Sequence, residues 1–473
     1  MFNLGVSLGL GVSLSLGASF SHAQTLPPEV DAALLRSKVP RDAVTILVTE
    51  VQGKAAPRLS HRASAPMNPA SLMKLVTTYA ALDLLGPAYT WSTPVYVEGA
   101  VRDGTLFGNL YIKGQGDPKL VAERLWLLLR RVQGLGVKTI AGDIVLDKGA
   151  FEIVEIDPSL FDGEPLRPYN AAPDALLLNF KSVVMTFVPD RTANTAQVQF
   201  EPPLAGVQMQ QSVPLSDAPC GDYRAALKAD FLDPAAIRFG GTYPASCGEK
   251  VWATAYADPK SYATRAVEGM WREMGGKLAG SVRYASVPTT LTRPAFEVSS
   301  PALPEVIRDI NKFSNNVMAQ QLFLSLSLQP KIATSVATLA TSREVVQRWW
   351  RSSISADDVP VLDNGSGLSR SERISANALG KLLQSAYASP VMPELMSSLP
   401  IIGVDGTLRS RRTAARGSAH LKSGTLRDVT GVAGYVLASS GKRYVFVMII
   451  NQPGAASART AIDSVVEWTM KDN

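Results

Sequence analysis

Residues 67–87 read MNPASLMKLVTTYAALDLLGP and are the most informative stretch of the chain. They predict one amphipathic helix with Asn68 as its N-cap, a proline in its first turn and a Gly-Pro pair at its end. The apolar residues form a broad surface, and Lys74 is one of only two charged residues in the stretch. The unusual feature is this lysine, which follows Ser71 by three positions near the start of a very apolar helix.

A serine hydroxyl becomes a useful nucleophile only when a base accepts its proton. Residues three apart on a helix share one face, so Lys74 can reach Ser71. Burial and nearby positive charge would lower the pKa of the lysine toward that of a usable base. The backbone N–H of a serine in a first helical turn can also help to hold an oxyanion. The alternative is a lysine whose amine simply extends into solvent.

The composition predicts an ordered globular protein. Of 473 residues, 46% are hydrophobic and 19% are charged, and this length suggests about two to four domains. The net charge is +6, but the basic residues are scattered without zinc-finger spacing, so we predict no nucleic-acid partner. His22, His61 and His420 are the only histidines, and H-E-x-x-H is missing. We therefore predict neither a metal nor a cofactor, and a histidine base could only be His61 or His420.

The chain starts with an uncharged segment rich in Leu, Val, Gly and Ser. Ser-His-Ala at 21–23 has the small-x-small pattern of a cleavage site, so we expect residues 1–23 to be a signal peptide and the protein to be periplasmic. The segment lacks Lys or Arg, and an uncleaved membrane anchor is the alternative. In an exported chain Cys220 and Cys247 predict one disulfide, with two free buried thiols as the alternative.

Two further segments offer polar groups that could join the Ser71–Lys74 pair. Ser314-Asn315-Asn316 precedes an apolar helical pattern and supplies a hydroxyl and two amides, although an ordinary helix cap explains the serine equally well. Lys422-Ser423-Gly424-Thr425 leads into two β-like runs that flank the turn SSGK and predict a hairpin. An edge strand suits a substrate that binds as an added strand.

Within the second segment, Gly424 permits close backbone approach and Lys422 can attract a carboxylate. A plain exposed strand start is the alternative. The three motifs S-x-x-K, S-x-N and K-[ST]-G nevertheless occur here in this order, which is a specific combination.

With these motifs the chain resembles the penicillin-interacting serine peptidases. Within them it is most similar to the class C D-alanyl-D-alanine carboxypeptidase/endopeptidase family of low-molecular-mass penicillin-binding proteins. The long interval between Lys74 and Ser314 fits the insertion of that family, and Ser423 departs mildly from the threonine of many relatives. Other segments that resemble the family are GQGDP at 114–118, YNAAPDALLLNF from 169, DNGSGLSRSERIS from 363 and LPIIGVDGTLRSR from 399.

The resemblance implies an α+β fold with a split penicillin-binding/β-lactamase-like serine transpeptidase domain, a β-sheet flanked by helices. Its two parts would be residues 24–87 and 290–473. Residues 88–289 would form a large, mostly β insertion of two nested small domains, the inner one near 180–275.

The same resemblance implies acyl transfer through a covalent serine intermediate. Ser71 would attack the carbonyl between two D-alanines of a peptidoglycan stem peptide or cross-link, and Lys74 would accept its proton. Ser314 would relay a proton to the leaving amine, and Asn316 would hydrogen-bond the substrate backbone. β-Lactam antibiotics would acylate the same serine.

The remaining family roles concern the substrate strand and the oxyanion. Lys422 would support Ser314 and, with Thr425, hold the terminal carboxylate beside Ser423 and Gly424. The backbone N–H groups of Ser71 and Thr425 would form the oxyanion hole.

A substrate with a free amine would need an acidic partner, and Asp162 and Glu164 in FDGEPLRPYN are candidates, with Asp174 no better supported. Solvated loop carboxylates are the alternative.

Two rival functions are a β-lactamase, which the long insertion disfavours, and a catalytically silent wall-binding module. The oligomeric state, a peripheral contact with the membrane or a cell-wall protein, and the balance of carboxypeptidase and endopeptidase activity are left open.

Overall fold

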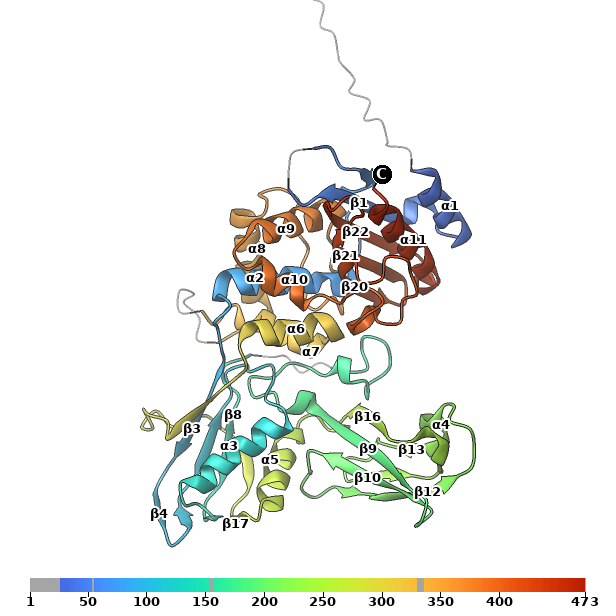
Figure 1. Cartoon of the computed structure of the whole chain (residues 1–473). Coiled ribbons are helices and arrows are strands. Elements are labelled where there is room, and N and C mark those ends of the chain that lie inside the picture. The colour runs from blue at the N-terminus through green and yellow to red at the C-terminus, as the bar shows by residue number, and fades with distance from the viewer. Residues whose placement is uncertain (1–25, 53–54, 153–156, 330–335, 473) are drawn as a thin grey trace, which may run out of the picture.

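The computed structural model describes residues 26–52, 55–152, 157–329 and 336–472. The signal peptide expected at residues 1–23 lies outside these ranges. Figure 1 shows one body that holds the first and the last described residues, with the middle of the chain extending away from it. This arrangement places segments far apart in sequence side by side.

The first body is built on a five-stranded antiparallel sheet with the strand order β2-β1-β22-β21-β20. Its strands come from both ends of the chain, so neither end can complete the sheet alone. They are β1 (Val44–Glu50), β2 (Leu59–His61), β20 (Ala419–Leu426), β21 (Val429–Leu437) and β22 (Arg443–Asn451). The predicted hairpin around SSGK is β21 and β22, and β20 lies at the sheet edge, as predicted.

Helices cover both faces of this sheet (Figure 1). Because side chains alternate along a strand, Ile46 and Val48 pack with α1 (Pro28–Arg36) and α11 (Arg459–Met470), whereas Leu47 packs in the opposite core. The helices on that opposite side are α2 (Met73–Leu85), α6 (Leu303–Phe313), α7 (Asn316–Ser325), α8 (Leu339–Ser353), α9 (Ala376–Ala388) and α10 (Met392–Ser398).

The helix expected in residues 67–87 starts later than its capping pattern predicted, and it is not amphipathic. Ala70–Leu72 form a 3-10 turn, the α-helix begins at Met73, and Asn68 Oδ1 accepts the Ala70 N–H at 2.9 Å. Every residue from Met73 to Leu82 is buried. A helix buried all round is the central element of the core, so the Lys74 amine cannot extend into solvent.

The part of the chain that follows α2 and precedes α6 forms four more sheets in the described residues. Two of them are built from the two ends of this segment, together with α3 (Ala122–Gly134) and α5 (Tyr262–Glu273). Their strands are β3 (Ser92–Val97), β4 (Ala100–Arg102), β5 (Thr105–Phe107), β6 (Leu110–Lys113), β7 (Thr139–Ile140), β8 (Ile144–Asp147), β17 (Lys277–Leu278), β18 (Val282–Tyr284) and β19 (Phe296–Ser299).

The other two sheets form a β-rich unit that also contains α4 (Tyr223–Leu227). A disulfide joins Cys220 to Cys247 within this unit, as predicted. Its strands are β9 (Ser182–Asp190), β10 (Thr195–Glu201), β11 (Gln208–Met209), β12 (Ser212–Ser216), β13 (Ala229–Asp230), β14 (Ala236–Phe239), β15 (Tyr243–Pro244) and β16 (Lys250–Ala255).

The domain boundaries stay a proposal, and the strand pairing favours moving two of them. β19 pairs antiparallel with β3, so we propose that the insertion continues to Ser299 rather than to residue 289. The helix α5 contacts β17, β18 and α3, so we propose an inner unit of residues 182–256 rather than 180–275.

Candidate active site

Lys74 lies at the centre of the candidate site, and its amine contacts three oxygen atoms. Its Nζ donates to Ser71 Oγ at 3.0 Å, to Asn316 Oδ1 at 2.6 Å and to the Ser366 carbonyl oxygen. The side chain of Lys74 is fully buried. The 3-10 turn places Ser71 just before α2, and the first turn of α2 points Lys74 back toward it.

The partners of Lys74 orient a neutral amine for proton transfer. The Asn316 and Ser366 oxygens are carbonyl oxygens and can only accept hydrogen bonds. Donation to all three oxygens belongs to the protonated lysine; the neutral amine has two N–H groups and one lone pair, so with both N–H groups donated to the two carbonyls its lone pair faces Ser71 Oγ. The site therefore holds the lysine in the orientation that a general base needs.

Burial lowers the pKa of both lysines of the site. Burial lowers the pKa of Lys74 well below its ordinary value, and the charge of Lys422 acts in the same direction, whereas the charge of Glu372 opposes both. Burial likewise lowers the pKa of Lys422 to about 7. A lysine in such surroundings can accept a proton near neutral pH.

Ser314 connects α6 and α7 in a left-handed conformation, with φ 57° and ψ 37°. Such a conformation is uncommon for a residue other than glycine, and it is often found at functional sites. Lys422 Nζ donates to Ser314 Oγ at 2.9 Å and to the Ser423 carbonyl at 2.7 Å. Asn315, the middle residue of the motif, caps α7 by accepting the Met318 N–H at 3.0 Å.

The sheet edge lies directly against the turn that carries Ser71. A Cβ on Gly424 would lie 2.7 Å from the Pro69 carbonyl oxygen and 3.2 Å from the Ser71 nitrogen, so only glycine fits there without movement. The Ser423 hydroxyl pairs with Thr407 Oγ1 at 2.6 Å.

A cleft of about 1020 Å³ lies beside these groups, between the first body and the insertion. Ser71, Ser314, Asn316 and Thr425 line one side of it, and Asp162, Tyr169 and Phe180 are among the lining residues from the insertion. The partly buried Ser71 therefore lies at a space large enough for a peptide.

The structure separates the two carboxylates suggested for amine recognition. Asp162 lines the cleft and accepts hydrogen bonds from Tyr169 Oη and Asn170 Nδ2, each at 2.8 Å. Partial burial opposes its ionisation, but these hydrogen bonds hold the pKa of Asp162 below its usual value. Glu164 instead forms an exposed ion pair with Arg167 at 3.3 Å.

Asp174 lies at a neighbouring cavity, where Lys181 and Lys148 contact it at 3.1 and 3.5 Å.

The two histidines available as alternative bases contact backbone carbonyls. His61 contacts the carbonyl of Arg41, and His420 contacts that of Met396. No group of three or more His, Cys, Asp or Glu side chains in the described ranges could hold a metal ion. Over the same ranges no helix has the length and apolar character to span a bilayer.

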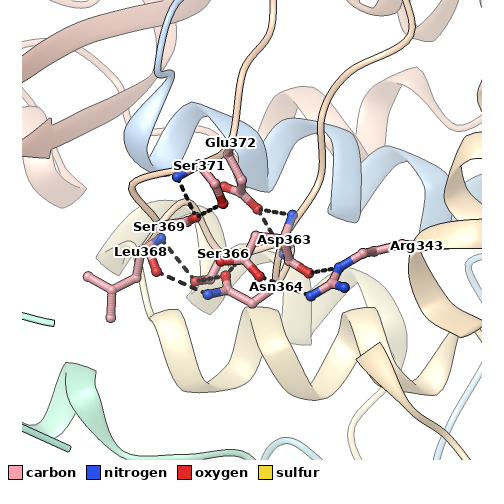
Figure 2. A network of polar contacts seen from close by, with 9 residues as sticks. Arg343, Asp363, Asn364, Ser366, Leu368, Ser369, Ser371 and Glu372 are labelled. Carbon is pink, nitrogen blue, oxygen red and sulfur yellow. Dashed lines mark hydrogen bonds and ion pairs between the residues drawn. The ribbon is translucent and has the colours of Figure 1, made fainter. Parts of the chain in front are cut away.

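The three motifs gave no role to the loop of residues 363–372, but this loop contributes directly to the site. This loop supplies the Ser366 carbonyl to Lys74, and Figure 2 shows the polar contacts that fold it. Arg370 extends into the cleft over the Phe161 ring, 4.7 Å from its centroid. The Gly- and Ser-rich sequence of the loop was the available signal, but a backbone acceptor leaves no mark on residue identity.

Comparisons with known proteins agree with this architecture. A D-alanyl-D-alanine carboxypeptidase from an Actinomadura species is 28% identical over 415 residues, 84% of this chain and 76% of the relative. The curated D-alanyl-D-alanine carboxypeptidase DacB from Haemophilus influenzae is 24% identical over 389 residues, 81% of this chain and 80% of the relative.

A crystal structure of penicillin binding protein 4 from Haemophilus influenzae has a TM-score of 0.72 at 22% identity and covers 93% of this chain and 99% of its own. This likeness confirms the predicted fold class. The model of the D-Ala-D-Ala carboxypeptidase 3 (S13) family matches residues 26–472, which span all of the described residues. The chain therefore belongs to the D-Ala-D-Ala carboxypeptidase 3 (S13) family.

Proposed function

We propose that the protein is a serine D-alanyl-D-alanine carboxypeptidase and endopeptidase that cleaves peptidoglycan stem peptides and D-Ala cross-links through an acyl-serine intermediate. The observation that carries this proposal is the buried Lys74 amine, oriented by two carbonyl oxygens so that its free position faces Ser71 Oγ. β-Lactams, which mimic the substrate, would acylate the same serine.

In the first step Lys74 Nζ accepts the hydroxyl proton of Ser71 while Oγ forms a bond to the carbonyl carbon of the penultimate D-alanine. The carbonyl oxygen becomes an oxyanion that the backbone N–H groups of Ser71 and Thr425 stabilise. Asn316 keeps its Oδ1 on Lys74. Its Nδ2 donates one N–H group to the Tyr169 carbonyl at 3.4 Å, and its second N–H group would donate to the substrate backbone.

In the second step the bond to the leaving nitrogen breaks, and the Ser314 hydroxyl relays to that nitrogen the proton that Lys74 took from Ser71, so that Lys74 ends the step as a neutral amine and Ser314 as a hydroxyl. Lys422, 2.9 Å from Ser314 Oγ, supports this transfer and attracts the terminal carboxylate together with Thr425. Water then attacks the serine ester, releases the shortened peptide and returns Ser71 to its starting form. No cofactor takes part in these steps.

The direct test is release of D-alanine from a muropeptide that ends in D-Ala-D-Ala. The wild-type protein should release one D-alanine per peptide, and Ser71→Ala should release none above background. A folded wild-type protein that leaves the peptide intact would contradict the proposal and favour a silent wall-binding module. A β-lactamase would instead hydrolyse penicillin rapidly without cleaving the peptide.

We also propose that Asp162, rather than Glu164, recognises a free amine of the substrate. Asp162 faces the cleft as a carboxylate, and a charge-assisted hydrogen bond to an ammonium group contributes about 1.5 to 3 kcal/mol. Asp162→Asn should therefore lower the preference for an amine-bearing peptide over its amine-lacking analogue by about tenfold or more.

The readout is the ratio of kcat/KM for the two peptides. Glu164→Gln is the matched control, because Glu164 pairs with Arg167, and it should leave this ratio unchanged. An unchanged ratio in Asp162→Asn would remove Asp162 from substrate recognition without affecting the assignment of Ser71.

The cellular location also remains a proposal. Removal of residues 1–23 on export would deliver the enzyme to the periplasm, where its peptidoglycan substrate lies.

A further inference from the structure

The loop of residues 363–372 is held against the helix that carries Lys74. Thr77 Oγ1 donates to the Gly365 carbonyl at 2.6 Å, and Lys74 Nζ donates to the carbonyl of the next residue, Ser366. Two successive carbonyl oxygens of the loop thus face α2. The position of the Lys74 amine therefore depends on the exact course of this loop.

Glu372 fixes that course from inside the loop (Figure 2). Its Oε1 accepts the backbone N–H groups of Asp363 and Gly365, each at 3.1 Å, and its side chain is fully buried. Its second oxygen, Oε2, is also buried and has no hydrogen-bond partner in the described structure. A glutamine could accept the same two N–H groups, so folding the loop does not require the costly negative charge.

The charge of Glu372 and the charge of Lys74 act on each other. Burial raises the pKa of Glu372 to about 7, and the positive charge of Lys74 limits this rise. Lys422 is the other buried cation of the site, and it acts on Lys74 in the opposite sense to Glu372. Asp363, the remaining carboxylate next to Glu372, is paired with Arg343 at 3.0 Å.

We propose that Glu372 is the positioning residue of the Ser71–Lys74 pair. It holds the Ser366 carbonyl on the Lys74 amine, and it supplies a buried negative charge whose effect on Lys74 opposes that of the positive charge of Lys422. This inference rests on the proposed function, since it assigns a partner to the proposed general base. Glu372 itself touches neither the substrate nor the reacting atoms.

The first test is Glu372→Gln, with the rate of acylation by a chromogenic β-lactam measured as a function of pH. A nearby carboxylate favours the protonated lysine, so removing its charge lowers the pKa of Lys74 and makes the base available at lower pH. The acid limb of the profile should move down by about one pH unit, with the rate on the high-pH plateau largely kept. A loop that is merely loosened would lower the plateau and leave the limb in place, which would overturn the proposal.

Glu394→Gln is the matched control. Glu394 Oε2 is also a buried oxygen without a hydrogen-bond partner in the described structure, but it lies on α10, outside the catalytic groups. Its variant should show the wild-type profile. Absence of any acylation in the wild-type protein would defeat the proposed function, whereas normal acylation with an unmoved limb in Glu372→Gln would defeat only the role of Glu372.

A second measurement keeps the proposal testable if Glu372→Gln does not fold. Coupling between two titrating groups is reciprocal, so loss of the Lys74 charge must raise the pKa of Glu372. Infrared difference spectroscopy can follow the band of the protonated buried carboxyl in the wild-type protein and in Lys74→Met. The band should persist to higher pH in the variant, and the same midpoint in both proteins would overturn the proposal.

Discussion

Lys74→Met is expected to slow acylation of Ser71 by about a thousandfold while leaving the protein folded. The methionine side chain fills most of the volume of the lysine stem but cannot accept a proton, and general-base catalysis contributes about 10²- to 10⁴-fold. Because Lys74 is fully buried, the replacement also removes a polar group from the core. The temperature of thermal unfolding should therefore stay the same or rise.

The measurement is the second-order rate constant of acylation by a chromogenic β-lactam at pH 7, together with thermal unfolding. Lys442→Met is the control, because Lys442 is an exposed lysine paired with Glu50 at 2.8 Å. The control should acylate at the wild-type rate. A Lys74→Met protein that acylates within tenfold of wild type would show that another group takes the proton of Ser71.

Gly367→Ala is expected to reduce both acylation and stability, because Gly367 packs against the turn that carries the nucleophile. A Cβ on Gly367 would lie 2.0 Å from the Ala70 carbonyl oxygen and 2.7 Å from Ser71 Cα, and its φ of +81° is left-handed. The conformation alone costs about 1 to 2 kcal/mol with a side chain. Relief of the contact must displace Ser71 or the loop, and a shift of about 1 Å can cost a hundredfold in rate.

Gly441→Ala separates the effect of backbone strain from the effect of the contact with the Ser71 turn. Gly441 also has a left-handed φ, +85°, but an added Cβ would have nothing within 4 Å. This control should lose only the stability that the backbone strain costs and should acylate normally. Equal acylation rates in Gly367→Ala and Gly441→Ala would contradict the proposed contact between Gly367 and the turn of Ser71.

The sequence predicted the central groups of the site because each depends on local spacing or on side-chain chemistry. Spacing predicted that Ser71 and Lys74 would meet at the start of α2, whereas the contact between Lys422 and Ser314 was implied only by the family resemblance. The hairpin that follows β20 was also predictable, because two β-like apolar runs flank a tight turn. The disulfide was predictable because the chain has only two cysteines.

The features that the sequence did not reveal depend on tertiary packing. The apolar surface of residues 67–87 was interpreted as one side of an amphipathic helix, but neighbouring strands and helices bury every residue of α2 from Met73 to Leu82. The partners of Lys74 include the Ser366 carbonyl, and any residue type has a carbonyl. Likewise, nothing in the sequence singled out Glu372, and only the fold shows that it is buried and interacts with the lysine.

The choice between Asp162 and Glu164 was open for a similar reason. The two residues lie in the same short loop, and sequence alone could not tell which one faces the cleft. Only the folded loop turns Asp162 toward Tyr169 and Asn170 and leaves Glu164 with Arg167.

The most direct test of the central claim is the intact mass of the purified protein after incubation with penicillin, followed by peptide mapping. The wild-type protein should gain the mass of one penicillin, and the modified peptide should carry it on Ser71. Ser71→Ala should gain none. A stable adduct on any other residue, or an adduct that persists in Ser71→Ala, would contradict the assignment of Ser71 as the nucleophile.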